Sequence, residues 1–255
     1  MTIKTIAVLH DLISCIIDST LNEIFLNREV CIYLMNNYFL YLTAITATIF
    51  ILLSSTAQAT DILVNTTPYC PDSTPTDRYI INTNVTFNCT APVYINVTGN
   101  DYAIFVNDSY TLDMNGTVLI GNTSGIGIQL GNNTILKNGI IRNYDKGIYL
   151  DNSINNTVSN NTVSNNTLTG IHLDSGSNNT IINNIVNNND FGIGLIFTTN
   201  TTISNNIVSN NTYGIKLDLG SNNTISNNTV SNNTNSGIYL YSGSNNTITN
   251  NIVNN

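Results

Sequence analysis

Apolar residues in the second half of the chain come in short alternating bursts that asparagine, glycine and serine separate, and their spacing is never helical. In the segment 200–221, NTTISNNIVSNNTYGIKLDLGS, the apolar positions that recur are Ile203, Val208, Ile215 and Leu217. These positions fall on three short runs with polar residues between them. The pattern predicts three short β-strands joined by tight corners.

The same pattern returns with a nearly constant period. Six copies of the tetrapeptide G-I-x-L are separated by 20, 23, 22, 22 and 23 residues, and six copies of Thr followed by Ile or Val by 23, 23, 22, 22 and 23 residues. Two independent markers that keep one period indicate a repeat architecture. The copies begin at Gly127, Gly147, Gly170, Gly192, Gly214 and Gly237, and at Thr134, Thr157, Thr180, Thr202, Thr224 and Thr247.

Three short strands in each repeat of 22–23 residues predict a triangular coil, and stacked coils predict an all-β solenoid, the right-handed parallel β-helix. Neighbouring coils lie about 4.8 Å apart in such a stack, so equivalent apolar residues form columns in the interior. Each buried aliphatic side chain contributes about 1.5–3 kcal/mol, which offsets the cost of ordering a polar tract. The expected columns are Ile135, Val158, Ile181, Ile203, Ile225, Ile248; Ile140, Val163, Val186, Val208, Val230, Val253; Ile148, Ile171, Ile193, Ile215, Ile238; and Leu150, Leu173, Leu195, Leu217, Leu240.

Asparagine suits the corners because it tolerates a left-handed backbone and its amide both donates and accepts hydrogen bonds along a stack. Two columns are expected to form amide ladders. The glycine that opens each G-I-x-L strand is expected where the backbone needs positive φ or where coils approach closely. The two asparagine columns are Asn160, Asn183, Asn205, Asn227, Asn250 and Asn161, Asn184, Asn206, Asn228, Asn251.

Residues 1–59 are expected to be a signal peptide with an over-extended start, because an apolar stretch is followed by Ala57-Gln58-Ala59, a good signal-peptidase site. A start at Met35 would leave a signal peptide of ordinary length. The alternative is that residues 38–53 stay as a membrane anchor, although a span needs about 20 apolar residues. Either way, the remainder is expected to be secreted or displayed on the cell surface.

The exported part is expected to have an N-terminal cap at residues 60–102 and a β-helix at residues 103–255. The sequence stops partway through a repeat without a covering element, so it is read as truncated, and self-association through the uncapped last coil is one way in which it could find a partner.

After residue 60 only Cys70 and Cys89 remain, and a disulfide between them is expected in an oxidising compartment, with two unpaired thiols as the alternative. Eleven Asp, no Glu and five Lys plus Arg make this part acidic, which argues against nucleic acid as a partner. Eighteen Asn-x-Ser/Thr sequons are potential glycosylation sites of an exported protein.

Two motifs carry a family resemblance: T-L-D-x-N-G at residues 111–116 and K-N-G-x-I-R-N at residues 137–143, followed by the repeats. They resemble the right-handed β-helix proteins of the NosD type, which belong with the pectate-lyase-like superfamily, and they are similar to Asn-rich surface proteins of methanogenic archaea. The resemblance implies roles that range from metal-site maturation to polysaccharide binding, polysaccharide cleavage or surface adhesion.

The outer surface of the G-I-x-L strands has the best candidate site for a ligand. Binding is expected to involve side chains that project from these strands, namely Tyr149, His172, Lys216 and Tyr239. Asp151, Asp174 and Asp218 follow the same strands, whereas Gly194 and Ile196 interrupt the pattern in the middle coil. The competing interpretation is an ordinary exposed sheet surface, on which aromatic and long polar residues are common.

Catalytic and metal candidates are few. Asp174 and Asp218 are the weak candidates for a carboxylate pair, and Arg142 is the weak candidate for a lyase base. Asp151 and Asp174 could contribute to a Ca²⁺ site on adjacent coils. No cofactor is expected, and copper is disfavoured because the part after residue 60 has one His, one Met and two cysteines that are expected to pair.

Three functions are consistent with the sequence. The first is a non-enzymatic surface or adhesin-like module. The second is a carbohydrate-binding or polysaccharide-active protein, which as an enzyme would be a lyase or a glycoside hydrolase acting on polysaccharide or cell-surface glycans. The third is a NosD-like periplasmic maturation factor for a metalloprotein.

Overall fold

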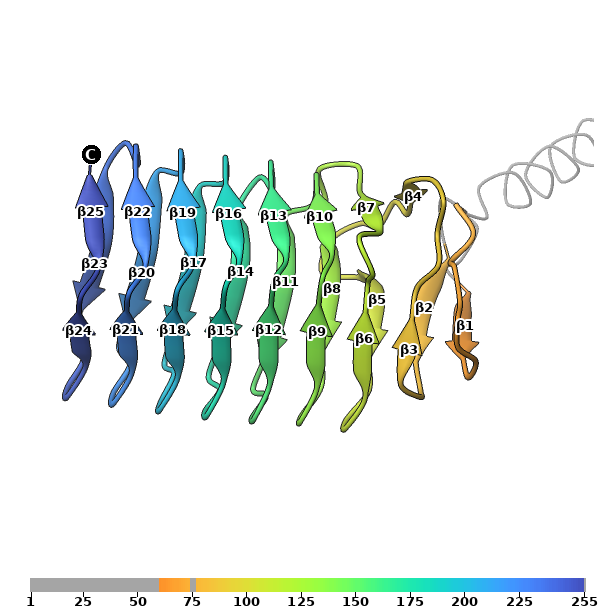
Figure 1. The fold of residues 1–255 in the computed structure, drawn as a ribbon, viewed down its shortest axis with the longest axis horizontal. Coiled ribbons are helices and arrows are strands. Elements are labelled where there is room, and N and C mark those ends of the chain that lie inside the picture. Colours follow the sequence, from red (N-terminus) through yellow and green to blue (C-terminus); the bar gives the residue numbers. More distant parts are fainter. Residues whose placement is uncertain (1–59, 74–76, 255) are drawn as a thin grey trace, which may run out of the picture. The chain divides into compact units, whose positions relative to one another are not determined.

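The computed structural model describes residues 60–73 and 77–254, which form a right-handed parallel β-solenoid. Figure 1 shows the coils stacked side by side in chain order. Within the described residues there are strands and turns but no helix, so no helix there is long and apolar enough to cross a membrane. The predicted fold class is confirmed. The expected signal peptide or anchor at residues 1–59 lies outside the described residues.

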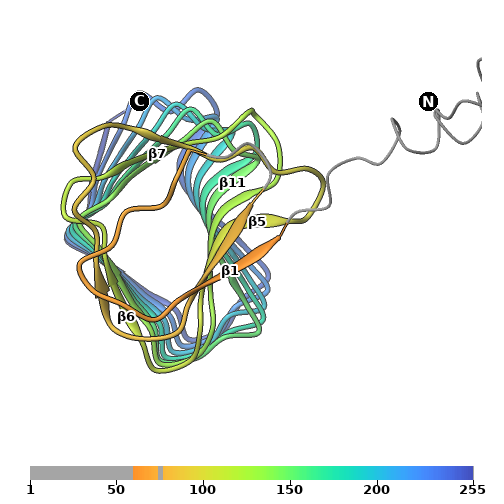
Figure 2. The same ribbon diagram turned by 90° about the vertical axis from the view of Figure 1, so that its right-hand side faces the viewer.

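Three parallel sheets run along the described solenoid, and each coil after the first strand contributes one strand to each sheet in turn. Figure 2 shows this three-sided cross-section. The first sheet has nine strands: β1 (Asp61–Val64), β2 (Arg78–Ile81), β5 (Tyr102–Val106), β8 (Ile126–Leu130), β11 (Lys146–Asp151), β14 (Thr169–Asp174), β17 (Phe191–Ile196), β20 (Tyr213–Asp218) and β23 (Ser236–Tyr241).

The second and third sheets have eight strands each. The second contains β3 (Val85–Thr86), β6 (Thr111–Asp113), β9 (Ile135–Lys137), β12 (Thr157–Ser159), β15 (Thr180–Ile182), β18 (Thr202–Ser204), β21 (Thr224–Ser226) and β24 (Thr247–Thr249). The third contains β4 (Val93–Tyr94), β7 (Val118–Ile120), β10 (Ile140–Arg142), β13 (Thr162–Ser164), β16 (Ile185–Asn187), β19 (Ile207–Ser209), β22 (Thr229–Ser231) and β25 (Ile252–Asn254).

The segment 60–102, expected to be a cap, contributes the first strands to all three sheets, and its β2 pairs in parallel with β5. Cys70 and Cys89 form the predicted disulfide within this segment, with their Cα atoms 5.1 Å apart. Tyr144 links the segment to the later coils, because its buried hydroxyl donates a hydrogen bond to the carbonyl oxygen of Ile95 over 3.1 Å.

The four apolar columns fill the interior as predicted from Val158 onward, and their members are fully buried as far as Val230. Two of the predicted core positions are wrong. Ile135 is 40% exposed and Ile140 is half-buried, whereas Leu136 and Ile141 face the core. In the last coil Leu240, Ile248 and Val253 keep their places in the sheets but are 39%, 44% and 45% exposed.

The shift at Ile135 has a local cause. Thr134 is buried, and both its backbone N–H and its hydroxyl donate to Oδ1 of Asn156 in the next coil, at 2.7 and 2.8 Å. Thr134 therefore occupies a corner position that asparagine holds in the next coil. Ile135, and not Thr134, pairs with Thr157, so the step at this point is one residue shorter than the sequence marker indicates.

One of the two predicted asparagine ladders is confirmed and the other is wrong. In the confirmed column each side-chain amide donates to Oδ1 of the asparagine one coil further on, as Asn184 does to Asn206 over 3.0 Å. The other column consists of exposed residues with φ between 55° and 58°, which turn the corner instead: Asn160, Asn183, Asn205, Asn227 and Asn250. Two further ladders, which the sequence did not predict, occupy the other corners: Asn166, Asn189, Asn211, Asn233, and Asn156, Asn179, Asn223, Asn246 with Thr201 in the gap.

Glycine opens the G-I-x-L strands because coils approach closely there. A Cβ atom on Gly170 would lie 2.5 Å from Val186 Cγ1 and 2.7 Å from the carbonyl oxygen of Gly192. Of the two reasons that the sequence left open, close approach is the one that applies, since this glycine has no positive φ.

Candidate functional site

The outer surface of the first sheet has three rows of side chains that run along the solenoid axis. Strand pairing in register places equivalent residues of β11, β14, β17, β20 and β23 next to one another. The first row is Lys146, Thr169, Phe191, Tyr213, Ser236; the second row is Tyr149, His172, Gly194, Lys216, Tyr239; and the third row is Asp151, Asp174, Ile196, Asp218, Tyr241. The predicted binding residues form the second row, and the three aspartates lie in the third.

At one end of the second row Tyr149 lies against His172, with ring centroids 5.3 Å apart. The ammonium of Lys146 lies 4.4 Å from the centre of the Tyr149 ring, a cation–π contact. Burial, together with the positive charge of Lys146, lowers the pKa of His172 to about 4, against the opposing effect of Asp174 and Asp151. The imidazole is therefore neutral at pH 7, so that one ring nitrogen can donate and the other accept a hydrogen bond.

Tyr149 is also affected by its surroundings. Burial, followed by the negative charges of Asp151 and Asp174 and a hydrogen bond to Asp151, raises the pKa of its hydroxyl to about 12. The phenol is therefore protonated at all physiological pH values. Its hydroxyl and its ring are both engaged by neighbours on the protein.

A hollow of about 210 Å³ lies in the middle of this surface, where Gly194 leaves the second row without a side chain. Residues of three adjacent strands and of the preceding corner line it: Leu168, Thr169, His172, Phe191, Gly194, Leu195, Ile196, Lys216 and Asp218. A Cβ atom on Gly194 would have its nearest neighbours at 3.5 and 3.6 Å, which is ordinary van der Waals contact. Packing does not require glycine here, in contrast to Gly192 on the same strand.

An aromatic pair and an ion pair border the hollow. Phe191 and Tyr213 stack with ring centroids 5.3 Å apart and an angle of 14° between their planes. Lys216 Nζ lies 4.9 Å from the centre of the Phe191 ring and 2.8 Å from Asp218 Oδ2. The site therefore combines an apolar aromatic wall with a cation, an anion and a neutral histidine.

The metal and catalytic candidates are placed as follows. Asp151 and Asp174 lie opposite each other on β11 and β14, as expected, and each accepts a hydrogen bond from its next residue, Asn152 or Ser175, at 2.9 and 2.8 Å. In the described ranges no three or more His, Cys, Asp or Glu side chains form a cluster that could hold a metal ion.

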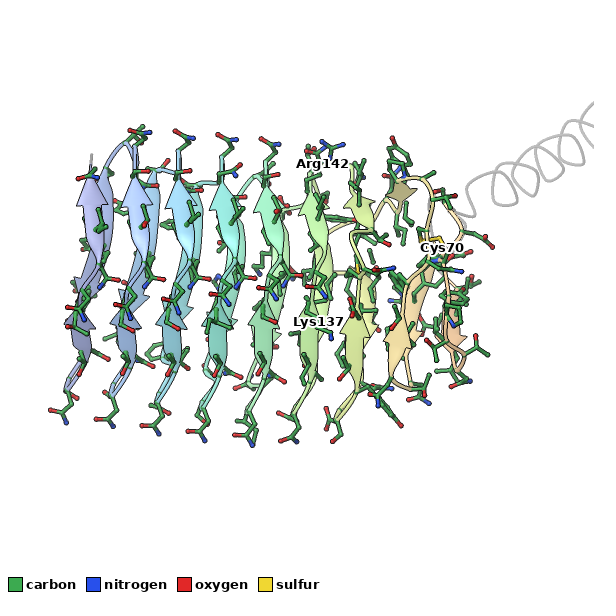
Figure 3. The ribbon with its side chains drawn as sticks, viewed as in Figure 1. Cys70, Lys137 and Arg142 are labelled. Carbon is green, nitrogen blue, oxygen red and sulfur yellow. A yellow bond between two sulfur atoms is a disulfide. The ribbon has the colours of Figure 1, made fainter. Side chains whose placement is uncertain are left out.

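Arg142 is not brought to this surface. It lies on β10 in the third sheet, as Figure 3 shows, whereas Asp174 and Asp218 lie on the first sheet. The residues weighed as copper ligands are dispersed too, because Met114 is buried in the core and the two cysteines are joined in the disulfide near the start of the described solenoid.

Sequence reasoning missed Phe191 and Tyr213. Both come directly before the G-I-x-L tetrapeptide, in D-F-G-I-G-L and T-Y-G-I-K-L, at a position where other repeats have Lys146, Thr169 or Ser236. Comparing the residue before the tetrapeptide from repeat to repeat would have found this aromatic pair.

Comparisons with known proteins agree with this architecture. A family model described as a right handed beta helix region matches residues 74–218 and 192–255. No curated protein sequence matches the chain.

Three solved structures are similar to this chain. Full-length tailspike protein 2 from a bacteriophage of Escherichia coli O157:H7 is 12% identical with a TM-score of 0.51, and the match covers 76% of this chain and 35% of the tailspike. A mutant of the periplasmic alginate epimerase AlgG is 19% identical with a TM-score of 0.50, covering 69% and 51% of the two chains. Pectate lyase Pel9A is 15% identical with a TM-score of 0.49, covering 72% and 58%.

The chain thus spans about a third to three fifths of the length of these proteins. At identities of 12% and 19%, the likeness to the tailspike and to the epimerase shows a common fold alone. The family model, in contrast, matches well over half of the chain. The repeats, the three parallel sheets and this match together place the chain in the right-handed β-helix family.

Proposed function

We propose that this chain is a non-enzymatic carbohydrate-binding β-helix, and that its ligand occupies the hollow at Gly194. The observation that carries the proposal is a glycine that packing does not require, at the centre of the row in which adjacent coils have His172 and Lys216. A Cβ atom would fit at this position in ordinary van der Waals contact. Its absence leaves space beside a pair of stacked aromatic rings.

The lining of the hollow suits a sugar. A pyranose ring has an apolar C–H face, which packs on aromatic rings, and a rim of hydroxyl groups, which need hydrogen-bond partners. Phe191 offers the apolar surface, and Lys216, Asp218 and neutral His172 offer donors and acceptors. The volume of about 210 Å³ is smaller than that of pockets that enclose whole ligands, so the rest of a glycan would remain in solvent.

Two observations favour binding over cleavage. Asp174 and Asp218 are separated by Ile196 on the intervening strand, so their backbones lie about 10 Å apart along the solenoid axis. The two residues are therefore not neighbours on adjacent coils. Moreover, Asp218 is paired with Lys216, and the one arginine weighed as a lyase base is on another sheet.

The alginate epimerase is an example of this fold in a protein named for its action on a polysaccharide, and this supports a glycan as the class of ligand. Action outside the cell is part of the proposal, on the basis of the cleavage site at Ala57-Gln58-Ala59 and of a disulfide that an oxidising compartment would maintain. Mass spectrometry of the exported protein is expected to find Thr60 at its N-terminus. A chain that keeps residues 38–53 would show membrane anchoring instead.

The direct test is a glycan array probed with the full chain, followed by titration calorimetry with the best ligand. Gly194→Val fills the hollow and is expected to weaken binding at least about tenfold, a difference of about 1.4 kcal/mol. Ser226→Val places the same side chain on the outer surface of the second sheet and serves as the matched control. The proposal is wrong if no neutral or acidic glycan binds, or if Gly194→Val binds as tightly as the control.

A further inference from the structure

The outward residues of the strand beneath the hollow, β17, are more apolar than those of the preceding coil. The outward positions of β17 are Phe191, Gly194 and Ile196, and Phe197 follows at the corner. At the equivalent positions the preceding coil has Thr169, His172, Asp174 and Ser175. Apolar residues therefore run across the solenoid along one strand, with polar side chains on the coil to one side.

Two bulky residues at this corner have an unfavourable backbone conformation. Phe197 and Leu219 have φ values of 53° and 57°, at a position where other coils have Asn152, Ser175 or Ser242. A left-handed backbone is uncommon for bulky side chains, and asparagine is several-fold enriched there.

Burial does not compensate, because Phe197 is 55% and Leu219 is 43% exposed. The two residues directly follow Ile196 and Asp218, which line the hollow. Strained and exposed residues therefore lie at one end of the candidate site. Residues with a strained backbone are found most often at active sites and ligand-binding sites.

The two tyrosines of the second row lie outside the hollow. Tyr149 and Tyr239 do not line the hollow. Tyr149 contacts His172 and Lys146 away from the hollow, and Tyr239 contacts Tyr213 in a T-shaped arrangement with ring centroids 5.7 Å apart. A ligand that follows the solenoid axis would have to use these two rings, whereas one that follows β17 would not.

We infer that the glycan lies along β17, across the solenoid, from Phe191 over Gly194 and Ile196 to Phe197. This inference rests on the proposed function of the hollow. The six residues of β17 span about 17 Å, which exceeds a single sugar ring, so the site selects an oligosaccharide. Its polar edges meet His172 and Asp174 on one side and Lys216 and Asp218 on the other.

The inference is tested with Phe197→Asn in the full chain, using titration with a monosaccharide and with the matching tetrasaccharide of the glycan chosen on the array. The substitution is expected to weaken tetrasaccharide binding at least about tenfold and to leave monosaccharide binding within about twofold. Because asparagine is favoured at this backbone conformation, the melting temperature is expected to rise, so lost affinity is not lost folding. Leu219→Asn is the second variant, and it is expected to weaken tetrasaccharide binding to a smaller extent.

Tyr149→Ser and Tyr239→Ser are the axial controls, and tetrasaccharide affinity is expected to stay within about twofold in both. If these two variants bind the tetrasaccharide more weakly and Phe197→Asn has no effect, the transverse orientation is wrong. The proposed function is tested separately by the loss of binding in Gly194→Val. Equal tetrasaccharide and monosaccharide affinity in the unmodified chain would also overturn it. Binding of a fatty acid or an apolar peptide in place of any glycan would overturn both proposals.

Discussion

Lys216 contacts both Phe191 and Asp218, which lie on two adjacent strands. Its ammonium lies 4.9 Å from the centre of the Phe191 ring on β17 and 2.8 Å from Asp218 Oδ2 on its own strand, β20. One cation thus holds the aromatic wall at one end of the hollow and the carboxylate at the other. The first and third rows of the surface are therefore coupled through a single side chain of the second row.

Lys216→Met is expected to destabilise the fold by about 1–2 kcal/mol. The substitution keeps the aliphatic stem but leaves Asp218 without its counter-ion, and among the described residues Asp218 Oδ1 is already buried without a hydrogen-bond partner. Urea unfolding at pH 7 measures the loss. In a double-mutant cycle with Asp218→Asn, we expect the combined loss to be smaller than the sum by about 0.5–1 kcal/mol, whereas additive losses would contradict the coupling.

Asn206 and Asn205 are adjacent in the sequence but have different roles. Asn206 Oδ1 accepts the backbone N–H and the side-chain amide of Asn184, at 2.9 and 3.0 Å, and its Nδ2 donates to Asn228 Oδ1 and to the carbonyl of Ile181. Asn206→Ala removes these bonds and leaves buried polar groups unpaired, so we expect a loss of about 3 kcal/mol or more.

Asn205→Ala is the matched control for this ladder. Asn205 is exposed and has a φ of 56°. Alanine is less stable than asparagine in this left-handed conformation, so Asn205→Ala is expected to lower the free energy of unfolding by about 1–2 kcal/mol. Asn205→Gly is expected to be nearly neutral. Chemical unfolding of the three variants gives the comparison. Similar losses for Asn206→Ala and Asn205→Gly would show that the buried ladder does not stabilise the solenoid.

Gly192 and Gly194, two residues apart on β17, are expected to respond oppositely to alanine. A Cβ atom on Gly192 would lie 2.6 Å from both the carbonyl oxygen of Gly214 and Val208 Cγ1, so Gly192→Ala forces coils apart and is expected to cost about 3 kcal/mol. Gly194→Ala meets no such contact and is expected to be neutral or to stabilise the fold by up to about 1 kcal/mol. Melting temperatures measure both, and a large loss at Gly194 would mean that packing requires this glycine after all.

The repeat period predicted the three sheets and the core columns from Val158 onward because the later coils keep the register that the Thr marker indicates, with steps of 23, 22, 22 and 23 residues. It failed in the segment NTILKNGIIRN, where Ile135 and Leu136, and again Ile140 and Ile141, offer two apolar residues for one inward position. The hydrogen bonds of Thr134 to Asn156 place Leu136 toward the core, and the backbone N–H of Gly139 donates to Asn161 Oδ1 directly before the second pair. That choice depends on the neighbouring coil and cannot be read from the periodicity.

The candidate site was predicted in part for a related reason. Tyr149, His172, Lys216 and Tyr239 do form one outward row, because alternation along a strand is enough to place them. Gly194, however, reads in the sequence as an interruption of that row, and only the empty space above it shows a hollow. Whether a glycine is required depends on which atoms its missing side chain would meet, which is a property of three coils together.

His172 is expected to make stability depend on pH in a defined window. Its pKa is about 4 in the folded chain, compared with an ordinary value of 6.5, so above pH 6.5 the imidazole is neutral in both the folded and the unfolded states. As the pH falls from 6.5 to 4, the unfolded state binds a proton that the folded state does not, and the free energy of unfolding decreases by up to about 3 kcal/mol. Below pH 4 the folded state also binds the proton, and this contribution levels off.

The measurement compares urea unfolding of the unmodified chain and of His172→Gln at pH 7, 5.5 and 4. Glutamine cannot take up the proton, so the difference in unfolding free energy between the two proteins is expected to change across this range and to favour the variant progressively as the pH falls. Parallel curves would contradict the lowered pKa. An NMR titration of the His172 ring protons, assigned by their absence in the variant, should have its midpoint near pH 4, and in that case the neutral imidazole keeps its hydrogen-bonding capacity toward a ligand throughout the range from pH 5 to 7.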